Sequence, residues 1–289
     1  MIPLQLQPKT GAVVVLFHPD WELFVQTFSS YAPAFEDVWV VANSLLPKNQ
    51  LKWLQEQSSV HLIQNMDNVG LGAALNMAFV QAQESGIDWM LTMDQDSGFE
   101  PGGAQELMQD LTTLPAHCAA YGANPLWHDR APKGRMEKKV IIQSGAFWSM
   151  EAWVRLGGFH EGLFIDGVDH EFCLRARKSG WSVYTQMNLA LIHALGQNLS
   201  VPAFLWRWHP WRKAGLTFHT ASREYYLIRN TAWLIGRYLF SDPLWSLKRS
   251  LYLVQRVLYA LFILPDKRNR IPSLLRALKD VFSVPPRKG

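Results

Sequence analysis

The sequence has few of the features that mark secreted, membrane-spanning or zinc-binding proteins. Only two of its 289 residues are cysteines, Cys118 and Cys173, so it has neither a disulfide framework nor the paired spacing of a zinc site. The N-terminus lacks the basic and apolar regions of a secretory signal peptide. The longest apolar stretch near the C-terminus, residues 251–264, is interrupted by Gln255 and Arg256 and is shorter than the roughly 18 residues of a membrane-spanning helix. We therefore predict a cytoplasmic protein.

Acidic residues are scarce in the last third of the sequence. Residues 1–203 carry 12 Lys and Arg against 20 Asp and Glu, a net charge of −8, whereas residues 204–289 carry 16 against 4, a net charge of +12. The same segment contains aromatic residues among its cations: Trp206, Trp208, Trp211, Trp233, Trp245, Tyr252 and Tyr259. Basic charge interleaved with aromatic rings fits an anionic membrane surface, where each nearby cation contributes about 1 kcal/mol.

We therefore predict that residues 204–289 form a basic, aromatic and mostly helical extension in peripheral contact with the inner face of the cytoplasmic membrane. The alternative is a helical appendage whose aromatic residues pack on the main domain and whose cations face water. A nucleic-acid surface would also be basic, but no nucleic-acid-binding motif accompanies this charge, so we expect no nucleic acid as a partner.

Short apolar runs alternate with helical patterns in the first hundred residues. The strand-like runs cover residues 12–17, 38–42, 60–64 and 89–93, and the helical patterns cover residues 23–32, 49–57 and 71–84. This alternation predicts a Rossmann-like α/β fold with a mostly parallel sheet flanked by helices. Ligands of such sheets bind beyond the carboxyl ends of the strands. We therefore expect four segments to lie along one rim of the sheet: residues 17–19, 42–43, 65–70 and 94–97.

Two carboxylates, Asp94 and Asp96, stand where the fourth strand-like run ends. Alternate residues of an extended chain point to the same side, so the two side chains are expected to converge on one point. Two hard oxygen donors with room for water and phosphate oxygens suit Mg²⁺ or Mn²⁺. Asp-x-Asp also occurs in ordinary turns and helix caps, so this pair alone leaves both a metal site and a turn open.

Two segments resemble the nucleotide-sugar half of the inverting family 2 glycosyltransferases. The first is Asn-Val-Gly-Leu-Gly-Ala-Ala-Leu-Asn at residues 68–76. The second, Met-Asp-Gln-Asp-Ser at residues 93–97, contains the carboxylate pair. In the setting of this resemblance, the pair is more than an ordinary turn.

Three later segments resemble the acceptor half of the same family. They are Ser-Gly at residues 144–145, Gly-Gly-Phe-His-Glu at residues 157–161, and residues 164–175, which begin Phe-Ile-Asp-Gly-Val-Asp-His-Glu. The combination of Asp-Gln-Asp-Ser with Phe-Ile-Asp-x-Val-Asp-x-Glu is closest to the bacterial rhamnosyltransferase branch. Residues 225–230, Tyr-Tyr-Leu-Ile-Arg-Asn, also resemble that branch.

The resemblance implies a GT-A fold and a metal-dependent transfer of a hexose from a nucleotide-sugar donor. It implies that Asp94 and Asp96 hold Mg²⁺ or Mn²⁺, and that Asp94 also approaches the donor ribose. His193 has the position of a family histidine near the diphosphate or the metal, although a lone histidine after an apolar run can also be a core residue. The expected donor-binding residues are Asn43, Asn68, Gly70, Asn76 and Asp94. Of these, Asn68 and Asn76 can instead fix a turn and a helix start.

The resemblance also implies a base and an acceptor side. Asp169 matches the family's catalytic base, which would take the proton of the acceptor hydroxyl as that oxygen attacks and inverts the anomeric centre. Glu171 is expected to belong to the catalytic site with Asp169, where it supports the site or orients Asp169. The expected acceptor-side residues are Gln143, Ser144, Gly145, Trp148 and Asp166. Trp148 can equally be a packed core residue.

Simpler structural roles are open for residues 164–177. If this segment opens a helix, Asp166 or Asp169 can cap it and complement its dipole. Arg175 and Arg177 can pair with the nearby carboxylates.

The sequence departs from the family pattern at three positions. Ala42 stands where the family has an acid that contacts the base or ribose, His160 stands where an Asp usually precedes the Glu, and Gly167 stands where an aromatic residue is common. These changes bear on the identity of the donor more than on the reaction type, because Asp94, Asp96 and Asp169 are all present.

We therefore expect an enzyme with one GT-A-like domain at residues 1–203, whose donor half covers about 1–100 and whose acceptor half covers about 101–203, followed by the extension. The expected reaction is inverting transfer of L-rhamnose from dTDP-rhamnose onto a cell-surface glycan or its lipid-linked precursor. One alternative is transfer from a UDP-sugar that carries galactofuranose or N-acetylglucosamine. The other is a non-catalytic GT-A scaffold at the membrane.

Overall fold

The computed structural model describes residues 7–125, 132–193, 198–199, 216–217 and 219–287. The chain forms two compact units. Unit 1 consists of residues 1–164, 168–193 and 286–289, and unit 2 consists of residues 165–167 and 194–285. The boundary that we predicted between residues 203 and 204 falls outside the described residues.

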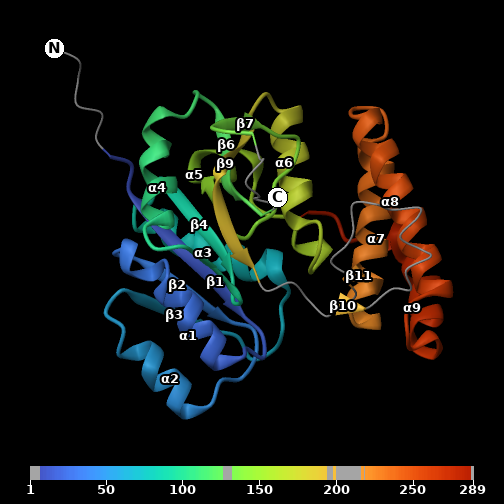
Figure 1. Cartoon of the computed structure of the whole chain (residues 1–289), viewed down its shortest axis with the longest axis horizontal. Coiled ribbons are helices and arrows are strands. Elements are labelled where there is room, and N and C mark those ends of the chain that lie inside the picture. The colour runs from blue at the N-terminus through green and yellow to red at the C-terminus, as the bar shows by residue number, and fades with distance from the viewer. Residues whose placement is uncertain (1–6, 126–131, 194–197, 200–215, 218, 288–289) are drawn as a thin grey trace. The chain divides into compact units, whose positions relative to one another are not determined.

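Unit 1 is built on a mixed sheet that has nine strands within the described residues (Figure 1). The strands are β1 (Thr10–Leu16), β2 (Val38–Ala42), β3 (Val60–Gln64), β4 (Trp89–Asp94), β5 (Ser97–Phe99), β6 (Cys118–Asn124), β7 (Arg135–Glu137), β8 (Ala146–Ser149) and β9 (Ser182–His193). Their order is β3-β2-β1-β4-β8-β6-β9-β5, and β7 pairs with β9. The Rossmann-like parallel arrangement is confirmed for β1 to β4, whereas β8 runs antiparallel to its neighbours β4 and β6.

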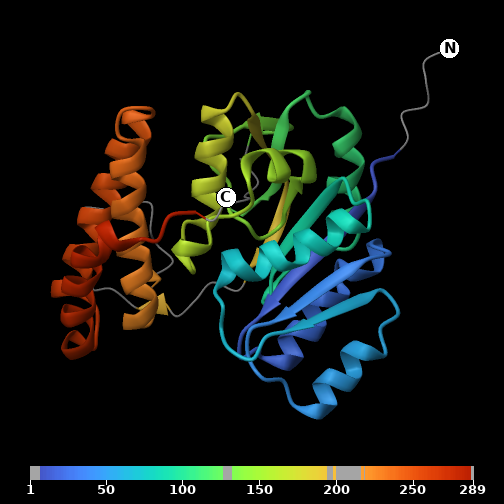
Figure 2. The ribbon, with the colours of Figure 1, turned by 180° about the vertical axis from the view of Figure 1, so that it is seen from behind.

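Helices cover both faces of this sheet (Figures 1 and 2). They are α1 (Trp21–Ser29), α2 (Lys48–Gln55), α3 (Leu71–Glu84), α4 (Gly103–Gln109), α5 (Met150–Leu156) and α6 (Val168–Lys178). The bounds of β2, β3 and α3 coincide with the predicted ranges. Because helices cover both faces of the sheet, its central strands bury apolar side chains on each face.

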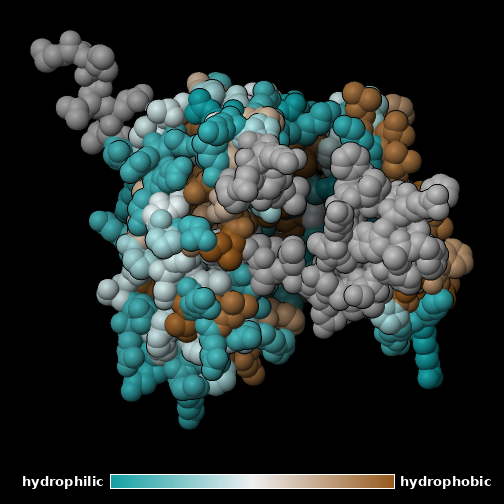
Figure 3. All heavy atoms as spheres, viewed as in Figure 1, coloured by the Kyte–Doolittle hydropathy of each residue, from teal (hydrophilic) through white to brown (hydrophobic). Residues whose placement is uncertain are grey.

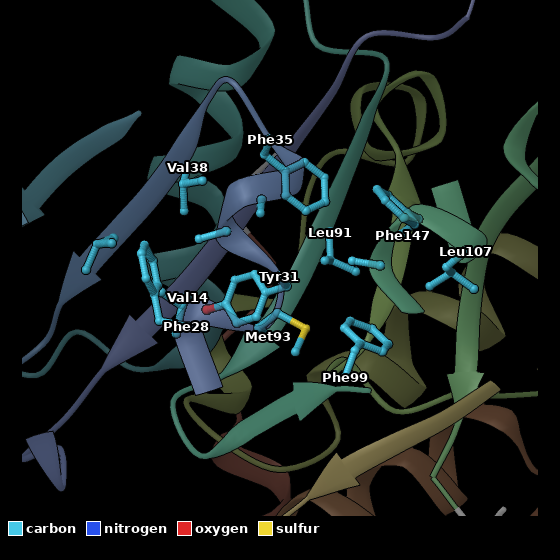
Figure 4. Close-up of a cluster of buried hydrophobic side chains, with 14 of the residues drawn as sticks. Val14, Phe28, Tyr31, Phe35, Val38, Leu91, Met93, Phe99, Leu107 and Phe147 are labelled. Carbon is cyan, nitrogen blue, oxygen red and sulfur yellow. The ribbon is translucent and has the colours of Figure 1, made fainter. Parts of the chain in front are cut away.

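Successive residues of a strand point to opposite faces, and this alternation divides the core. Val14 of β1, Leu91 of β4 and Phe147 of β8 join one buried cluster with side chains of α1, α2 and α4 (Figure 4). Trp148, the next residue of β8, lies on the other face, where its ring centroid is 5.3 Å from that of Phe159. Each fully buried large apolar side chain contributes about 1.5–3 kcal/mol.

Unit 2 consists mainly of three helices within the described residues, α7 (Ala221–Tyr238), α8 (Pro243–Phe262) and α9 (Lys267–Lys279), with the short pair β10 (Asn198–Leu199) and β11 (Leu216–Thr217). Asp242 caps α8 by accepting from Trp245 N–H at 3.1 Å, and Pro243 takes the first helical position. The predicted helical extension is confirmed. In the part of the chain that the structure describes, none of the helices is long and apolar enough to cross a membrane.

A buried ion cluster joins the three helices of unit 2. Glu224 of α7 pairs with Arg256 of α8 at 2.6 Å and with Arg270 of α9 at 3.7 Å, and all three side chains are buried. Removing one partner of such a pair leaves an uncompensated buried charge, which costs about 3–5 kcal/mol. The cluster therefore specifies how the three helices pack.

Candidate active site

The carboxyl ends of β1 to β4 lie at one edge of the sheet. Leu16 of β1 is in register with Ala42 of β2, and Asp94, the last residue of β4, is in register with the end of β1. Backbone hydrogen bonds extend the edge: Asn43 N–H donates to Leu16 O at 2.7 Å, and Asn65 N–H donates to Ala42 O at 2.9 Å. The rim that we predicted from four segments is confirmed.

Gln95 and Ser44 hold the loops of this rim together. Gln95 Oε1 accepts from Phe17 N–H at 2.8 Å, and Gln95 Nε2 donates to Phe17 O at 3.3 Å. Ser44 Oγ accepts from His18 N–H at 2.9 Å. Neither residue was predicted from the sequence, because a glutamine or serine in a loop carries no local signal of a partner on another strand.

Asn43 organises the loop of residues 65–70. Its Nδ2 donates to Asn68 Oδ1 and to Gly70 O, both at 3.2 Å, and its Oδ1 accepts from Asn65 Nδ2 at 2.8 Å. Because Asn43 is buried and both its amide hydrogens are used, it holds the loop, which corrects its predicted role in donor binding. The Nδ2 group of Asn68, by contrast, has no hydrogen bond within the described residues and is available to a ligand.

Gly70 is required by the close approach of two backbones. Its φ is +86°, and a Cβ at this position would lie 2.8 Å from Phe164 O. The next residue, Leu71, begins α3 and donates its N–H to Phe164 O at 2.5 Å. Gly70 therefore lies close to Phe164, and this contact is a sufficient reason for a glycine at this position.

Asp94 and Asp169, which are far apart in the sequence, contact the same residue. Gln143 Nε2 donates to Asp94 Oδ1, and Gln143 N–H donates to Asp169 Oδ2 at 3.1 Å. Asp94 N–H in turn donates to Ser144 Oγ at 3.0 Å. The donor-side carboxylate and the predicted base therefore share one short segment, residues 143–145.

Thr92 and Gly145 determine where this segment lies. Thr92 Oγ1 donates to Gln143 O, and Gly145 N–H donates to Thr92 O at 2.9 Å. Gly145 has φ +70°, and a Cβ there would lie 2.6 Å from Leu191 Cδ1, so a larger residue would strain both backbone and packing. The sequence contains one signal that residues 143–145 are held here, because Thr92 is a polar residue within an otherwise apolar strand. Our prediction did not use it.

Gln143 also presents an unused acceptor. The residue is only 6% exposed, and its Oε1 has no hydrogen-bond partner among the described residues. Leaving a buried amide oxygen unsatisfied costs about 1–3 kcal/mol, and the bonds that Gln143 donates to Asp94 and Asp169 offset that cost.

Replacing Gln143 by Leu should lower kcat/KM by about 10- to 100-fold, because a hydrogen bond to a charged group contributes about 1.5–3 kcal/mol. We expect the loss because Asp94 would no longer be held in place, and steady-state kinetics with the donor varied will measure it. Gln186→Leu is the matched control, since Gln186 Nε2 donates to Asp110 Oδ2 at 2.7 Å elsewhere in the sheet. Equal losses in the two variants would contradict a positioning role for Gln143.

Asp96 lies in a turn and not on a strand. β4 ends at Asp94, Gln95 and Asp96 form the turn, and β5 begins at Ser97 and pairs with β9. The strand alternation that predicted the convergence of Asp94 and Asp96 therefore does not apply. The turn instead places both residues at the tip of β4.

The chemistry of this tip fits a divalent cation that keeps other ligands. Two carboxylates are the hard oxygen donors that Mg²⁺ and Mn²⁺ prefer, with water and phosphate oxygens completing the shell. Among the described residues, no group of three or more His, Cys, Asp or Glu could hold a metal ion.

Asp169 lies in the first turn of α6, and both roles that the sequence left open are compatible with its contacts. Its Oδ1 accepts from His170 N–H at 2.7 Å, at the positive end of the helix dipole. Its Oδ2 faces Gln143 N–H. The helix-start contact is observed, and it does not compete with a role as base.

Glu171 has contacts that suit a supporting residue and not a group that reacts. It is 1% exposed and pairs with Arg175 at 2.6 Å. Arg175 also donates to Leu156 O at 2.5 Å and to Gly158 O at 2.9 Å, which ties α6 to the end of α5. The expected pairing of Arg175 with a nearby carboxylate is confirmed.

Asn76 and Trp148 belong to the protein interior. Asn76 Nδ2 donates to Phe159 O at 3.0 Å and to Glu161 Oε1 at 3.1 Å, and its Oδ1 accepts from Phe159 N–H at 2.8 Å. This amide joins α3 to residues 159–161, which replaces its predicted donor contact. Trp148 is completely buried and donates to Thr92 Oγ1 at 2.7 Å, which fits the packed core role that the sequence left open beside an acceptor contact.

Asp166 and His193 were predicted near the acceptor and the metal. Asp166 belongs to unit 2, where its carboxylate pairs with Arg223 at 3.2 Å and its carbonyl accepts from Asn230 Nδ2 at 2.8 Å. The Tyr-Tyr-Leu-Ile-Arg-Asn motif therefore contacts the motif that contains Asp166. The backbone of His193 pairs with Ser97, but its side chain lies outside the described part, so its metal contact stays a prediction.

Burial controls the other titratable groups around the site. Burial, followed by the charge of Asp94, raises the pKa of Tyr31 well above its ordinary value, so this phenol stays neutral. Burial likewise raises the pKa of Cys173, with the charges of Asp169 and Glu171 adding to the effect, and it raises the pKa of Cys118 to about 12. Neither thiol is therefore a nucleophile or a metal ligand at neutral pH.

A hollow of about 330 Å³ lies at the other end of the strands. It is lined by Asp88 and Trp89 at the start of β4, Cys118 at the start of β6, and Trp181. Because it is formed by strand starts and not by carboxyl ends, it is separate from Asp94 and Gln143.

Known proteins resemble this chain in sequence and in fold. No family model matches the sequence. The chain is similar to the dTDP-rhamnosyl transferase RfbF of Shigella flexneri, with 26% identity over 241 residues that cover 75% of this chain and 76% of that protein.

Two solved structures are similar in fold. One is the crystal structure of GalNAc-T7 with UDP, GalNAc and Mn²⁺, with a TM-score of 0.60 and 11% identity; the match covers 98% of this chain but only 59% of that chain. The other is the crystal structure of S. aureus TarS 1–349 in complex with UDP-GlcNAc, with a TM-score of 0.57 and 12% identity. This match covers 96% of this chain and 82% of that chain.

Proposed function

We infer that this chain, which has the GT-A fold and resembles the rhamnosyltransferase branch of family 2, is a glycosyltransferase. More specifically, we propose inverting transfer of L-rhamnose from dTDP-rhamnose onto a hydroxyl group of a cell-surface glycan or its lipid-linked precursor. The observation that carries the proposal is that Asp94 and Asp169 both bond to Gln143 at the carboxyl ends of the sheet, where folds of this class bind ligands.

Asp169 is the proposed base. An acceptor hydroxyl is a poor nucleophile and must lose its proton as it attacks, and a positioned base contributes about 10²–10⁴-fold to such a step. The bonds from Gln143 N–H and His170 N–H hold the carboxylate in one orientation. Attack from the face opposite the leaving diphosphate would invert the anomeric centre.

Asp94 and Asp96 are the proposed ligands of Mg²⁺ or Mn²⁺, with His193 as a further candidate. A bound ion would supply a Lewis acid that offsets the charge building on the leaving diphosphate. The crystal structure of GalNAc-T7 with UDP, GalNAc and Mn²⁺ supports this by analogy. Asn68 Nδ2 is the proposed contact from the 65–70 loop to the donor.

The donor nucleotide is the finer part of the proposal. The sequence similarity to a dTDP-rhamnosyl transferase favours dTDP. Ala42 also stands where the family has an acid that contacts the base or ribose, so the 2′-hydroxyl of UDP would gain no carboxylate partner there. UDP-sugars are the alternative, because both similar structures contain UDP or UDP-GlcNAc.

Competition binding with dTDP and UDP in the presence of Mn²⁺ tests the donor. We expect dTDP to bind more tightly than UDP, and we expect dTDP-rhamnose to be the nucleotide-sugar from which the purified protein releases nucleoside diphosphate. Release of UDP from a UDP-sugar, with no binding of dTDP, would replace the donor assignment. No release from any nucleotide-sugar with either metal would favour the non-catalytic scaffold.

The acceptor also bears on where the protein works. A lipid-linked precursor lies at a membrane, and we propose that the chain acts at the inner face of the cytoplasmic membrane as a peripheral protein. The basic helices of unit 2 would supply that contact.

A further inference from the structure

α8 exposes a continuous row of apolar side chains. Six of them are between 48% and 69% exposed: Leu244, Leu247, Leu251, Val254, Leu258 and Phe262. Because they are three or four residues apart, they occupy one face of the helix along its whole length. Trp245, Arg256 and Ala260 on the opposite face are buried, so the exposed row takes no part in the core of unit 2.

α9 and the adjoining turns carry further exposed apolar residues. Ile271, Leu275 and Leu278 of α9 repeat the same spacing and are 38–64% exposed. Phe240, between α7 and α8, and Phe282, after α9, are each 94% exposed. In Figure 3, apolar atoms gather on the surface of this helical unit. Such a concentration of exposed apolar side chains marks an interaction surface and not scattered surface residues.

Four of the seven aromatic residues that we predicted at a membrane lie in the described part of the chain. Trp245 is 6% exposed, and Trp233, Tyr252 and Tyr259 are partly buried. Trp206, Trp208 and Trp211 lie outside that part, so their membrane contact stays a prediction. Among the described residues, the exposed surface of α8 and α9 is mainly aliphatic.

Cations accompany the exposed row, and α8 and α9 contain no acidic residue to offset them. The two helices have eight Lys and Arg and no Asp or Glu. Arg256 and Arg270 are buried against Glu224. Five of the remaining cations are exposed: Lys248, Lys267, Arg268, Arg276 and Lys279.

We propose that α8 and α9 dock on an anionic lipid bilayer, with the row from Leu244 to Phe262 entering the acyl boundary and the exposed cations meeting the headgroups. An amphipathic helix with an aliphatic face and basic flanks lies in the plane of such an interface. A second copy of this chain could also cover the row. Pairing through the same face would, however, bring the exposed cations of both copies together without an acid from either helix between them.

Co-sedimentation of the full-length protein with vesicles tests this surface. We expect binding to phosphatidylcholine vesicles that contain phosphatidylglycerol, weaker binding at high salt, and little binding to phosphatidylcholine alone. The combined substitution Leu247→Ser, Leu251→Ser and Leu258→Ser should weaken binding by at least about tenfold, because three apolar side chains no longer enter the bilayer. All three side chains are exposed, so the thermal unfolding midpoint should stay unchanged.

A matched variant controls for the general loss of surface apolarity. Val80→Ser, Met136→Ser and Val154→Ser remove three apolar side chains of unit 1 that are 36–47% exposed, and this variant should bind vesicles like the wild type. Reversing charge by Lys267→Glu and Arg268→Glu should weaken binding only to the anionic vesicles.

Two results would overturn the proposal. One is equal partitioning of the wild type and the α8 variant. The other is a wild-type dimer in sedimentation velocity that the α8 variant converts to a monomer while neither binds vesicles, which would identify a second copy as the occupant. The proposal deepens the membrane location proposed above, but binding is measured without donor or acceptor, so the result is independent of the transferase reaction.

Discussion

Asp169→Asn should abolish sugar transfer while the fold and the binding of nucleotide are retained. Asparagine has nearly the same size and keeps one oxygen that can accept from Gln143 N–H or His170 N–H, but it cannot take a proton from the acceptor hydroxyl. Loss of a general base lowers kcat by about 10²–10⁴-fold. Release of nucleoside diphosphate in the presence of acceptor measures kcat, and nucleotide binding reports on the donor side separately.

Glu151→Gln is the matched control, because it makes the same carboxylate-to-amide change in the first turn of another helix, α5. Glu151 pairs with Arg155 on the surface at 2.9 Å, so we expect its kcat and its free energy of unfolding to stay close to those of the wild type. Full turnover in Asp169→Asn, or an equal loss in both variants, would remove Asp169 as the base.

Asp96→Ala should abolish metal-dependent transfer. Metal ligation that stabilises the leaving diphosphate is worth several kcal/mol, which corresponds to at least about 10²-fold in rate. Because Asp96 lies in a turn at the tip of β4, its removal should leave the sheet intact. Calorimetric titration of dTDP in the presence and absence of Mn²⁺ gives a readout that does not depend on turnover, and we expect the metal dependence of binding to disappear.

Glu100→Ala is the control for this experiment, since Glu100 is an exposed carboxylate directly after β5. It should bind Mn²⁺ and nucleotide like the wild type. Mn²⁺-dependent nucleotide binding that survives in Asp96→Ala would show that the cation is held elsewhere, and the donor side of the site would then have to be reassigned.

Patterns of local period were sufficient to predict the first four strands and the first three helices. The bounds of β2, β3 and α3 coincide with the apolar runs and helical spacing, because each such pattern reflects burial of that element alone. The rim formed by Asn43, residues 65–70 and Asp94 followed from the general rule for parallel sheets. The loops that follow the strands could thus be assigned to one edge before any contact was known.

The roles of individual polar residues were less predictable. Asn43 and Asn76 were expected to bind the donor, but their amides hold loops through partners that are 22 or more residues away in the sequence. The turn at Gln95 and Asp96 was also missed, because β5 pairs with β9, a strand far along the chain. A short motif contains no information about which distant backbone groups will compete for its side chains.

The residue sequence by itself determined the order of strands and helices, the apolar faces that they bury, and the presence of three motif aspartates, since these depend on composition and local period. Only the tertiary structure decided that Gln143 connects Asp94 with Asp169, and that mainly aliphatic side chains form the exposed row of α8. The physical reason is the same in both cases. Hydrogen bonds and burial between segments depend on where the folded backbone brings them together, and no single segment encodes that position.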